Sequence, residues 1–584
     1  MSALLPPPHG PHAAGDAKKT DLAGRNTPFC GAGDHHHPKK PRGGPSAAKL
    51  ALASFLFVGA LFALDAYLAG AGADRPLRHQ YQHYLGRGGG GSSRAESESE
   101  SKSASPSWLS VPSPTNFTED LLARWLTPGG SRCRDARTAN ISVPLLDGAE
   151  LSAAEIHEFR FWALDDAGAR RCLGGDFFEI DLAGEAWKSR PPVVDRGDGS
   201  YTFRLQVAPR FAADNKFRLT IVLLFRSFEG LKFSSARFSY HTELRRIPLL
   251  FRPGNASLPA LETCRAADFR RDVWSGRWTR LARNDNCEDV DDAGRYRCLE
   301  PDHPCEAPWC EGPLGALESN GWVYSAHCSF KLFTADAAWR CLDGKWLFFW
   351  GDSNHVDTIR NLLAFVLGVE DTSAVTRRFD AVFTNPSGEP GTVRITSIYN
   401  GHWNMSMNYL GLHSLRHRGF RQLVRSYFMG GDRVPDAVVL NSGLHDGCYW
   451  SSFRAYVQAT EFAAQFWSGV MAKVRSRGLA APRVFYRTTV ATGGYARDLA
   501  FNPNKMELFN GVLVERLRQH GVLTGGVIDN FDMTFPWHYD NRCNDGVHYG
   551  RAPAKLVWRD GKIGHQYFVD LMLGHVLLNA ICNG

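Results

Sequence analysis

The stretch KWLFFWGDS, residues 345–353, decides the fold prediction. Its first six residues, 345–350, are mostly apolar and predict a buried strand. Gly351, Asp352 and Ser353 then open a helix, and Asp and Ser are ordinary N-caps. A Ser at such a turn is exposed beside the helix N-terminus, so it can act as a nucleophile whose own amide stabilises an oxyanion. The tripeptide alone is weak evidence, because it also occurs by chance.

The remainder of residues 345–584 repeats this alternation of strand and helix. Four further apolar runs predict strands at 393–399, 436–440, 484–489 and 526–529. Helix-length amphipathic segments lie at 357–367, 417–428, 453–477, 506–519 and 565–579. This pattern predicts an α/β/α sandwich with a five-stranded parallel sheet, covered on both faces. Ligands bind at the carboxyl ends of strands in such sheets.

Residues with catalytic chemistry follow these strands. Gly401 follows the second strand and Asn441 the third, and an amide from each can donate to the oxyanion formed beside Ser353. Asp545 and His548 follow the fifth strand, three residues apart, so the carboxylate can orient the imidazole. A serine hydroxyl needs a base, and the base needs an orienting acid. Each residue alone has a structural explanation, whereas the ordered set predicts an active site.

Five residues flanking this predicted site are candidates for substrate binding: Asp352, Trp403, His445, Tyr449 and Trp450. The aromatic rings among them can stack on sugars. Packing between the loops is an equally good explanation for them.

Residues 115–245 predict a separate all-β domain. Alternating runs at 159–163, 201–207 and 217–225 are separated by turn signals. The pattern resembles filamin-type immunoglobulin-like repeats, with Cys133 and Cys172 as a candidate pair. A spacer or support role is favoured over ligand binding for this domain.

Residues 260–344 are rich in Cys and Trp and lead into the α/β domain. Cys305, Cys310 and His303 could be zinc ligands, but their spacing matches no standard paired-ligand pattern. Disulfides are the better interpretation, and we predict no metal site.

A membrane anchor is expected before these domains. Residues 50–73 are almost wholly apolar, interrupted by Asp65, and are long enough to span a bilayer. A tail, residues 1–47, is basic and expected to be disordered and cytosolic, and residues 74–114 form a Gly/Ser-rich stalk. The prediction is a single-span type II protein.

Cysteines and glycosylation sequons support lumenal placement of the rest of the chain. Twelve of the 13 Cys follow the expected span. So do the four Asn-x-Ser/Thr sequons, at Asn116, Asn140, Asn255 and Asn404.

The overall composition is that of a multidomain globular protein. The chain has 584 residues, of which 43% are hydrophobic and 22% charged. This length suggests about two to four domains. The net charge of +7 is modest and partly lies in the tail, so the composition gives no sign of a nucleic-acid partner.

The site residues resemble the four conserved blocks of the SGNH (GDSL-like) hydrolases. Ser353, Gly401, Asn441 and His548 correspond to these blocks in order. By this resemblance Ser353 is the nucleophile, His548 the base with Asp545 as its orienter, and Gly401, Asn441 and the Ser353 amide are oxyanion donors.

Longer stretches resemble the PC-esterase group within these hydrolases. These are residues 322–354, residues 436–446 (DAVVLNSGLHD) and residues 543–550 (CNDGVHYG). The group includes plant trichome-birefringence-like polysaccharide O-acetyltransferases and the animal NXPE (neurexophilin and PC-esterase) family. The order of span, immunoglobulin-like domain, Cys-rich segment and esterase resembles NXPE most closely, over roughly residues 116–584.

The resemblance implies a Golgi enzyme that transfers acetyl groups to a glycan or polysaccharide through an acyl-serine. It implies no bound cofactor. The acetyl donor is open between acetyl-coenzyme A and an acetylated intermediate, and a donor made by a partner protein is conceivable. Two alternatives remain: a glycan O-acetyl esterase with the same site, and a non-catalytic glycan- or receptor-binding ectodomain.

Overall fold

The computed structural model describes eleven stretches of the chain. They are residues 107–126, 136–144, 146, 148–212, 216–233, 237–254, 256–280, 322–401, 409–539, 546–549 and 567–583. None of the helices in these stretches combines the length and apolar character that a bilayer span requires. The expected span, 50–73, the tail and the stalk up to residue 106 lie outside the described residues, so the anchor stays a prediction. The last residues of the expected stalk, 107–114, are described, and there the Leu109 N–H donates to Gln206 Oε1 of the β-sandwich region at 2.7 Å.

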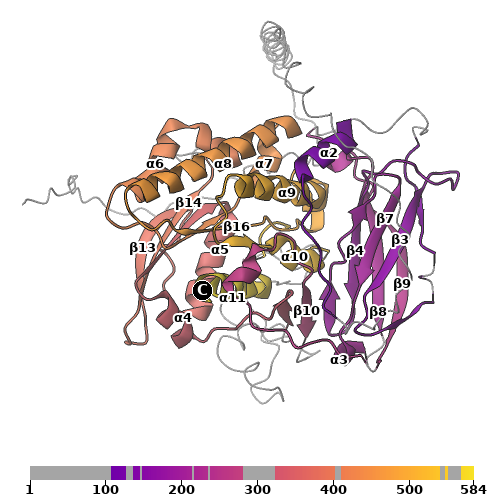
Figure 1. The fold of residues 1–584 in the computed structure, drawn as a ribbon, viewed down its shortest axis with the longest axis horizontal. Helices are drawn as coiled ribbons and strands as arrows, with labels where there is room; N and C mark the ends of the chain where they lie inside the picture. The colour runs from indigo at the N-terminus through magenta and orange to yellow at the C-terminus, as the bar shows by residue number, and fades with distance from the viewer. Residues whose placement is uncertain are drawn as a thin grey trace, which may run out of the picture. The chain divides into compact units, whose positions relative to one another are not determined.

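The C-terminal part of the chain is a doubly wound α/β domain built on a six-stranded sheet (Figure 1). Its strands are β12 (Lys345–Gly351), β13 (Arg378–Thr384), β14 (Thr392–Tyr399), β15 (Ala437–Leu440), β16 (Arg483–Arg487) and β17 (Gly526–Ile528). They lie in the order β13-β14-β12-β15-β16-β17. All neighbours are parallel except β13, which pairs antiparallel with β14. The expected five parallel strands are present, but the expectation of a purely parallel five-stranded sheet was wrong.

Helices lie on both faces of this sheet. Those of the α/β domain are α4 (Ala335–Leu342), α5 (Ser353–Asn361), α6 (Arg418–Met429), α7 (Leu444–Tyr449), α8 (Phe453–Ser476), α9 (Pro503–Gln519), α10 (Asn530–Thr534) and α11 (Tyr567–Cys582). Helices α6, α8 and α9 lie on one face, and α5 and α11 pack together on the other (Figure 1). A π-helical turn, Leu362–Val366 (η5), continues α5.

The order of the strands reverses direction at β12. After β12 the chain forms β13 and β14 on one side of it, and then crosses back to form β15 on its other side. Doubly wound sheets bind ligands at the carboxyl ends of the strands beside such a switch point. The residues that follow β12 and β15 are therefore the first place to look for chemistry.

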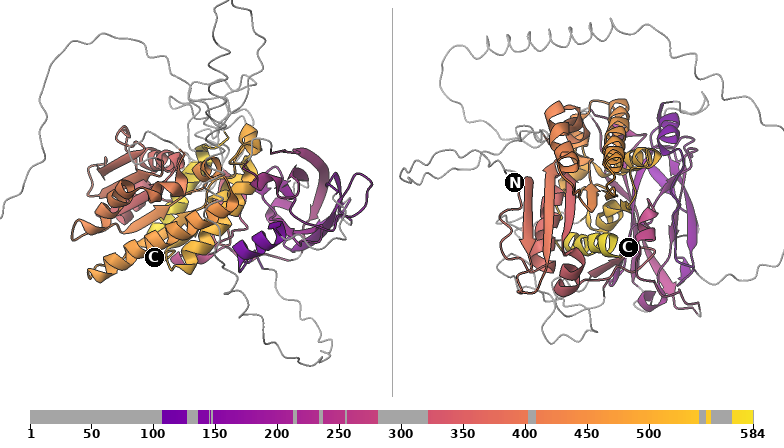
Figure 2. Two further views of the ribbon diagram at one scale, coloured as in Figure 1. Left: turned by 90° about the horizontal axis from the view of Figure 1, so that it is seen from above. Right: turned by 60° about the vertical axis from the view of Figure 1, so that its left-hand side comes forward.

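The N-terminal part of the described chain is a two-layered β-sandwich (Figure 2). Its smaller sheet holds β1 (Asn140–Ser142), β3 (His157–Leu164), β7 (Ser200–Leu205) and β6 (Val194–Asp195). Its larger sheet holds β4 (Phe177–Ala183), β5 (Trp187–Ser189), β8 (Phe217–Phe225), β9 (Thr242–Arg252) and β2 (Glu150–Ser152). Apolar side chains from both sheets, Phe161 and Phe178 among them, form one core.

The larger sheet also contains two strands from the segment that follows the β-sandwich in the sequence. Strands β10 (Arg277–Arg280) and β11 (Trp322–Ser325), from the Cys/Trp-rich segment, extend it through pairing of β10 with β5. Two disulfides tie this segment down, Cys264–Cys328 and Cys341–Cys582. Cys172 is also disulfide-bonded, while Cys133, its expected partner, lies outside the described residues.

Shorter elements complete the fold. Helix α2 (Phe117–Leu126) packs against α9, and α3 (Pro209–Ala212) lies in the sandwich. Five 3-10 turns lie among the described residues, at Glu229–Leu231, Ala266–Arg270, Gly411–Arg416, Gly494–Asp498 and Phe535–Trp537.

Candidate active site

The Gly351–Ser353 turn presents a serine at the start of a helix. Asp352 is the N-cap of α5, and its carboxylate accepts the backbone N–H of Asn354 at 3.0 Å. Ser353 follows as the first helical residue and is half-buried. An N–H at this position has no acceptor within the helix, so the Ser353 amide can donate to a substrate oxygen.

The serine hydroxyl contacts a histidine from the far end of the domain. Ser353 Oγ lies 2.7 Å from His548 Nε2, across 195 residues of sequence. His548 is 5% exposed. A hydroxyl at hydrogen-bond distance from an imidazole has the geometry of a nucleophile and its general base. Asp545, the expected orienting acid, lies outside the described residues.

The segment that carries His548 is held by backbone contacts. The Gly493 N–H donates to the Gly546 carbonyl at 2.7 Å, and the buried Tyr549 hydroxyl donates to the Ala491 carbonyl at 2.8 Å. Gly546 has φ +88°, and a Cβ on it would lie 2.7 Å from the Gly493 carbonyl oxygen. The turn before His548 therefore requires glycine.

The ends of three neighbouring strands meet at the serine. Asn400, after β14, donates its backbone N–H to the Gly351 carbonyl at 2.8 Å, and Asn441, after β15, donates its own to the Trp350 carbonyl at 2.9 Å. Gly401 is buried and follows Asn400 directly. The two expected oxyanion donors thus lie on the strands that flank β12.

One hydrogen bond holds the Asn441 side chain. Its Nδ2 donates one N–H to the Arg487 carbonyl at 3.0 Å, which leaves a second N–H on the same nitrogen. Its Oδ1 is buried and accepts no hydrogen bond from the described residues. The Arg487 carbonyl thus fixes the plane of the amide and leaves one N–H to donate to another acceptor.

His445 and Asn400 form a buried support behind these donors. Asn400 Nδ2 donates to the Asn441 carbonyl and to Ser442 Oγ, each at 3.2 Å, so Asn400 Oδ1 accepts from His445 Nδ1 at 2.9 Å. His445 Nε2 then faces the Tyr399 hydroxyl at 3.4 Å. Burial lowers the pKa of His445 to about 4, so the ring is neutral at physiological pH. These contacts orient Asn400, which sequence analysis missed although it directly follows a predicted strand.

A buried arginine that the sequence analysis also missed lies beside the turn that carries Ser353. Arg487 ends β16 and lies 3.7 Å from Asp352 Oδ1, and both side chains are 1% exposed. It donates to Thr358 Oγ1 at 3.2 Å, and that hydroxyl donates to Asp570 at 2.6 Å. Burial lowers the pKa of Arg487, opposed by Asp352 and Asp570. The arginine balances the charge of a carboxylate that has been removed from water.

Gly351 is required by the packing around the turn. A Cβ there would lie 2.6 Å from His355 Cε1 and 3.0 Å from Asn441 Cβ. His355 is itself buried, and burial followed by the charge of Arg487 lowers its pKa well below the ordinary value. It is a neutral ring that packs against Gly351 and Phe349.

The candidate substrate-binding residues fall into three groups. Asp352 and His445 are buried and bind protein groups, as described above. Tyr449 ends α7 and Trp450 follows it. Both are half-buried and lie beside His413, whose ring stacks on Tyr449 with 4.5 Å between the ring centroids. Trp403 lies outside the described residues. Sugar stacking by these rings stays a prediction.

Two of the four sequons are in described segments. Asn116 and Asn140 are both exposed, and Asn140 Oδ1 also accepts from Arg245 at 3.0 Å. Asn255 and Asn404 lie outside the described residues.

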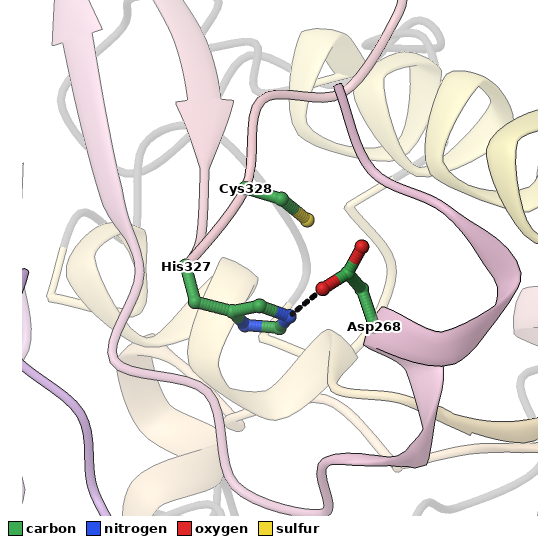
Figure 3. Close-up of side chains that lie close together, drawn as sticks. All are labelled: Asp268, His327 and Cys328. Atoms are coloured by element: carbon green, nitrogen blue, oxygen red, sulfur yellow. Dashed lines mark ion pairs between the residues drawn. The ribbon is translucent and has the colours of Figure 1, made fainter. Parts of the chain in front are cut away.

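Among the described residues, one cluster of metal-ligand residue types occurs, and it includes neither Ser353 nor His548 (Figure 3). Asp268 Oδ1 lies 3.3 Å from His327 Nε2, beside Cys328. The Cys328 sulfur is bonded to Cys264 and supplies no thiolate. The remaining Asp–His pair is too small a ligand set for a structural zinc site. The zinc candidates considered from sequence, Cys305, Cys310 and His303, lie outside the described residues.

Comparison with known proteins finds matches among solved structures. No family model and no curated protein matches the chain. A solved structure of LAE5, an alpha/beta hydrolase enzyme from the metagenome of Lake Arreo, Spain, matches with 13% identity over 41% of this chain and 97% of that one, at a TM-score of 0.23. Axe2, an acetylxylan esterase from Geobacillus stearothermophilus, matches with 12% identity over 41% of this chain and 94% of its own, at a TM-score of 0.24. The resemblance to PC-esterases and NXPE therefore stays a prediction from motifs.

Proposed function

We propose that this chain is an acyl-ester enzyme that acts on O-acetyl groups of glycans through an acetyl-serine at Ser353. The observation that supports it most is the 2.7 Å contact of Ser353 Oγ with His548 Nε2, at the N-terminus of α5. A binding module has no need of a hydroxyl–imidazole pair beside open amide donors. The glycan acetyl ester as substrate rests on the motif resemblance.

The first half-reaction forms the acyl-serine. His548 Nε2 takes the proton of Ser353 Oγ as that oxygen bonds to the acetyl carbonyl carbon, and the carbonyl oxygen becomes the oxyanion. The N–H of Ser353 and the Nδ2–H of Asn441 donate to it, with Gly401 as a third proposed donor. One such donor contributes about 3–4 kcal/mol. The ester C–O bond then breaks, and His548 gives its proton to the departing oxygen.

The second half-reaction decides the enzyme class. His548 takes a proton from the incoming hydroxyl, which attacks the acetyl-serine, and Ser353 Oγ leaves with that proton. Water as the acceptor gives an esterase, and a sugar hydroxyl gives an O-acetyltransferase. We propose transfer as the principal direction, on the motif resemblance, with Tyr449 and Trp450 as stacking surfaces for the acceptor. Asp545 is proposed to orient His548.

Turnover of p-nitrophenyl acetate by the purified chain tests this proposal, with and without glycan acceptors. Ser353→Ala is the control, and its folding is checked by circular dichroism. Ser353-dependent release of p-nitrophenol, with the acetyl group recovered on the glycan, supports the transferase. Release that acceptors leave unchanged supports the esterase. Equal rates in a folded Ser353→Ala protein would refute both and favour a binding ectodomain.

We also propose that the enzyme is a Golgi type II membrane protein with its catalytic part in the lumen. The apolar run 50–73 and the exposed sequons Asn116 and Asn140 support this placement. Protease protection in intact microsomes tests it, because a cytosolic catalytic part would be digested. Loss of both glycans on Asn116→Gln and Asn140→Gln should shift the mass of the protected fragment.

A further inference from the structure

A buried glutamate in the β-sandwich faces away from the sandwich core. Strand β4 is buried on both faces, and Phe178, Ile180 and Leu182 belong to the core between the two sheets. Since side chains alternate along a strand, Glu179 lies on the opposite face. It is 0% exposed, so its charge must be matched by groups that pack on that face.

Those groups come from two loops of the α/β domain. Glu179 Oε2 accepts from the guanidinium of Arg497, and Oε1 lies 2.8 Å from His538 Nε2. Burial acts to raise the pKa of Glu179, but Arg497 and His538 outweigh it and lower the pKa to about 2. A second residue of the sandwich region, His241, contacts Arg497 from its other side at 2.7 Å.

The same two loops hold the segment of the catalytic histidine. Arg497 belongs to the turn Gly494–Asp498, which begins directly after Gly493. Gly493 donates to the Gly546 carbonyl at 2.7 Å, and the Gly494 N–H donates to the His538 carbonyl at 3.1 Å. A Cβ on Gly493 would lie 2.7 Å from that carbonyl oxygen. The three backbones are packed too closely for one to move without the others.

We propose that Glu179 is a positioning residue for His548, so that the β-sandwich forms part of the catalytic apparatus. The path runs from Glu179 through Arg497 and His538 to Gly493, and from Gly493 to Gly546, two residues before His548. The inference rests on the proposed function, because it assigns His548 the role of base. The sandwich is then more than the spacer or support that its sequence suggests.

The matched control is a second ion pair between the same two parts of the chain. Arg190, which follows β5, pairs with Glu507 on α9, and neither belongs to the path to Gly546. Glu179→Gln and Glu507→Gln each remove one carboxylate charge from a contact between the sandwich and the α/β domain. Only the first should disturb His548.

Steady-state kinetics on the full chain separate positioning from stability. Glu179→Gln should lower kcat for p-nitrophenyl acetate at least tenfold with little change in KM, since small displacements of a catalytic group cost one to two orders of magnitude. Glu507→Gln should keep kcat within twofold of wild type even where its Tm falls. Equal kcat values for Glu179→Gln and Glu507→Gln would overturn the proposal.

A second variant and a second readout cover misfolding and lack of turnover. Gly493→Ala perturbs the path without removing a buried charge and should reproduce the kcat loss. Amide hydrogen exchange of residues 546–549 should quicken at least tenfold in Glu179→Gln and remain unchanged in Glu507→Gln. Unchanged exchange in both would overturn the coupling. Absence of Ser353-dependent turnover in wild type would refute the proposed function instead, and the exchange result would still decide the coupling.

Discussion

Replacing Arg487 with methionine should damage both stability and catalysis. Methionine keeps much of the side-chain volume but removes the charge that lies 3.7 Å from Asp352 Oδ1. At an effective dielectric constant of about 20, that separation corresponds to roughly 4 kcal/mol of attraction. Removing one partner of a buried pair typically costs about 3–5 kcal/mol, because the other charge stays buried without compensation. We expect the free energy of unfolding to fall by that amount.

The catalytic effect follows from the place of Asp352. Its carboxylate caps α5 and fixes the turn that carries Ser353, so an uncompensated Asp352 should shift that turn. A displacement of about 1 Å can lower the rate roughly 10²-fold. We therefore expect a loss in kcat of that order with a smaller change in KM, measured with p-nitrophenyl acetate on the folded fraction.

Two comparisons make this prediction refutable. Arg483→Met changes an arginine at the other end of the same strand, β16, and should leave kcat near wild type. The double variant Arg487→Met with Asp352→Asn should recover part of the lost stability, because no unpaired charge remains. Guanidinium unfolding measures these differences. A single Arg487→Met variant with kcat within twofold of wild type and a stability change below about 1 kcal/mol would refute the reasoning.

Three further predictions concern pH and a disulfide. The pKa of Glu179 is lowered from 4.5 to about 2, so its ionised form should stabilise the fold by about 3 kcal/mol above pH 4.5, and this is lost as the pH falls toward 2. The unfolding free energies of wild type and Glu179→Gln should therefore converge in acid, and a constant difference would contradict this. Burial raises the pKa of Asp570 from 3.8 to about 6, so stability relative to Asp570→Asn should rise by up to about 3 kcal/mol as the pH falls from 8 to 4, and a flat profile would contradict it. The disulfide Cys341–Cys582 joins residues separated by 241 positions, so Cys582→Ser should lower the unfolding free energy by about 2–5 kcal/mol. An unchanged denaturation midpoint would contradict this.

The sequence predicted the central strands well because each is an apolar run between turn signals. The expected strand at 345–350 corresponds to β12, and the expected strand at 393–399 to β14. The antiparallel strand β13 was missed. It lies at the sheet edge, where exposed and partly buried residues alternate and charged side chains are tolerated.

Elements that depend on distant partners were also missed. Strand β10 is only four residues long, and it is a strand because it pairs with β5, nearly ninety residues earlier in the chain. Helix α7 has six residues and contains Gly447, so it shows no helical period. Local patterns carry no information on such pairings.

The residues of the candidate site, like the strands and helices, were predicted only in part. Ser353, Asn441 and His548 could be proposed because reactive residue types follow predicted strands, and the structure places the serine and the histidine in contact. Arg487 and Glu179 carry no such mark. Arginine and glutamate side chains are usually exposed to solvent, and only the packed structure shows that Arg487 and Glu179 are buried.

The position of these two charged residues suggests why the site needs more than its α/β domain. Ser353, the proposed nucleophile, is fixed within that domain through Asp352, which follows β12, and Arg487, at the end of β16. His548, the proposed base, lies in a short segment that is held at Gly546 by a loop, and that loop in turn binds Glu179 of the sandwich. A serine and a histidine fixed by separate supports keep their 2.7 Å contact only if both supports hold. Loss of the Arg487 support and loss of the Glu179 support should therefore each lower kcat, and the double loss should cost less than the sum of the two single losses in free energy, because both act on the same Ser353–His548 contact.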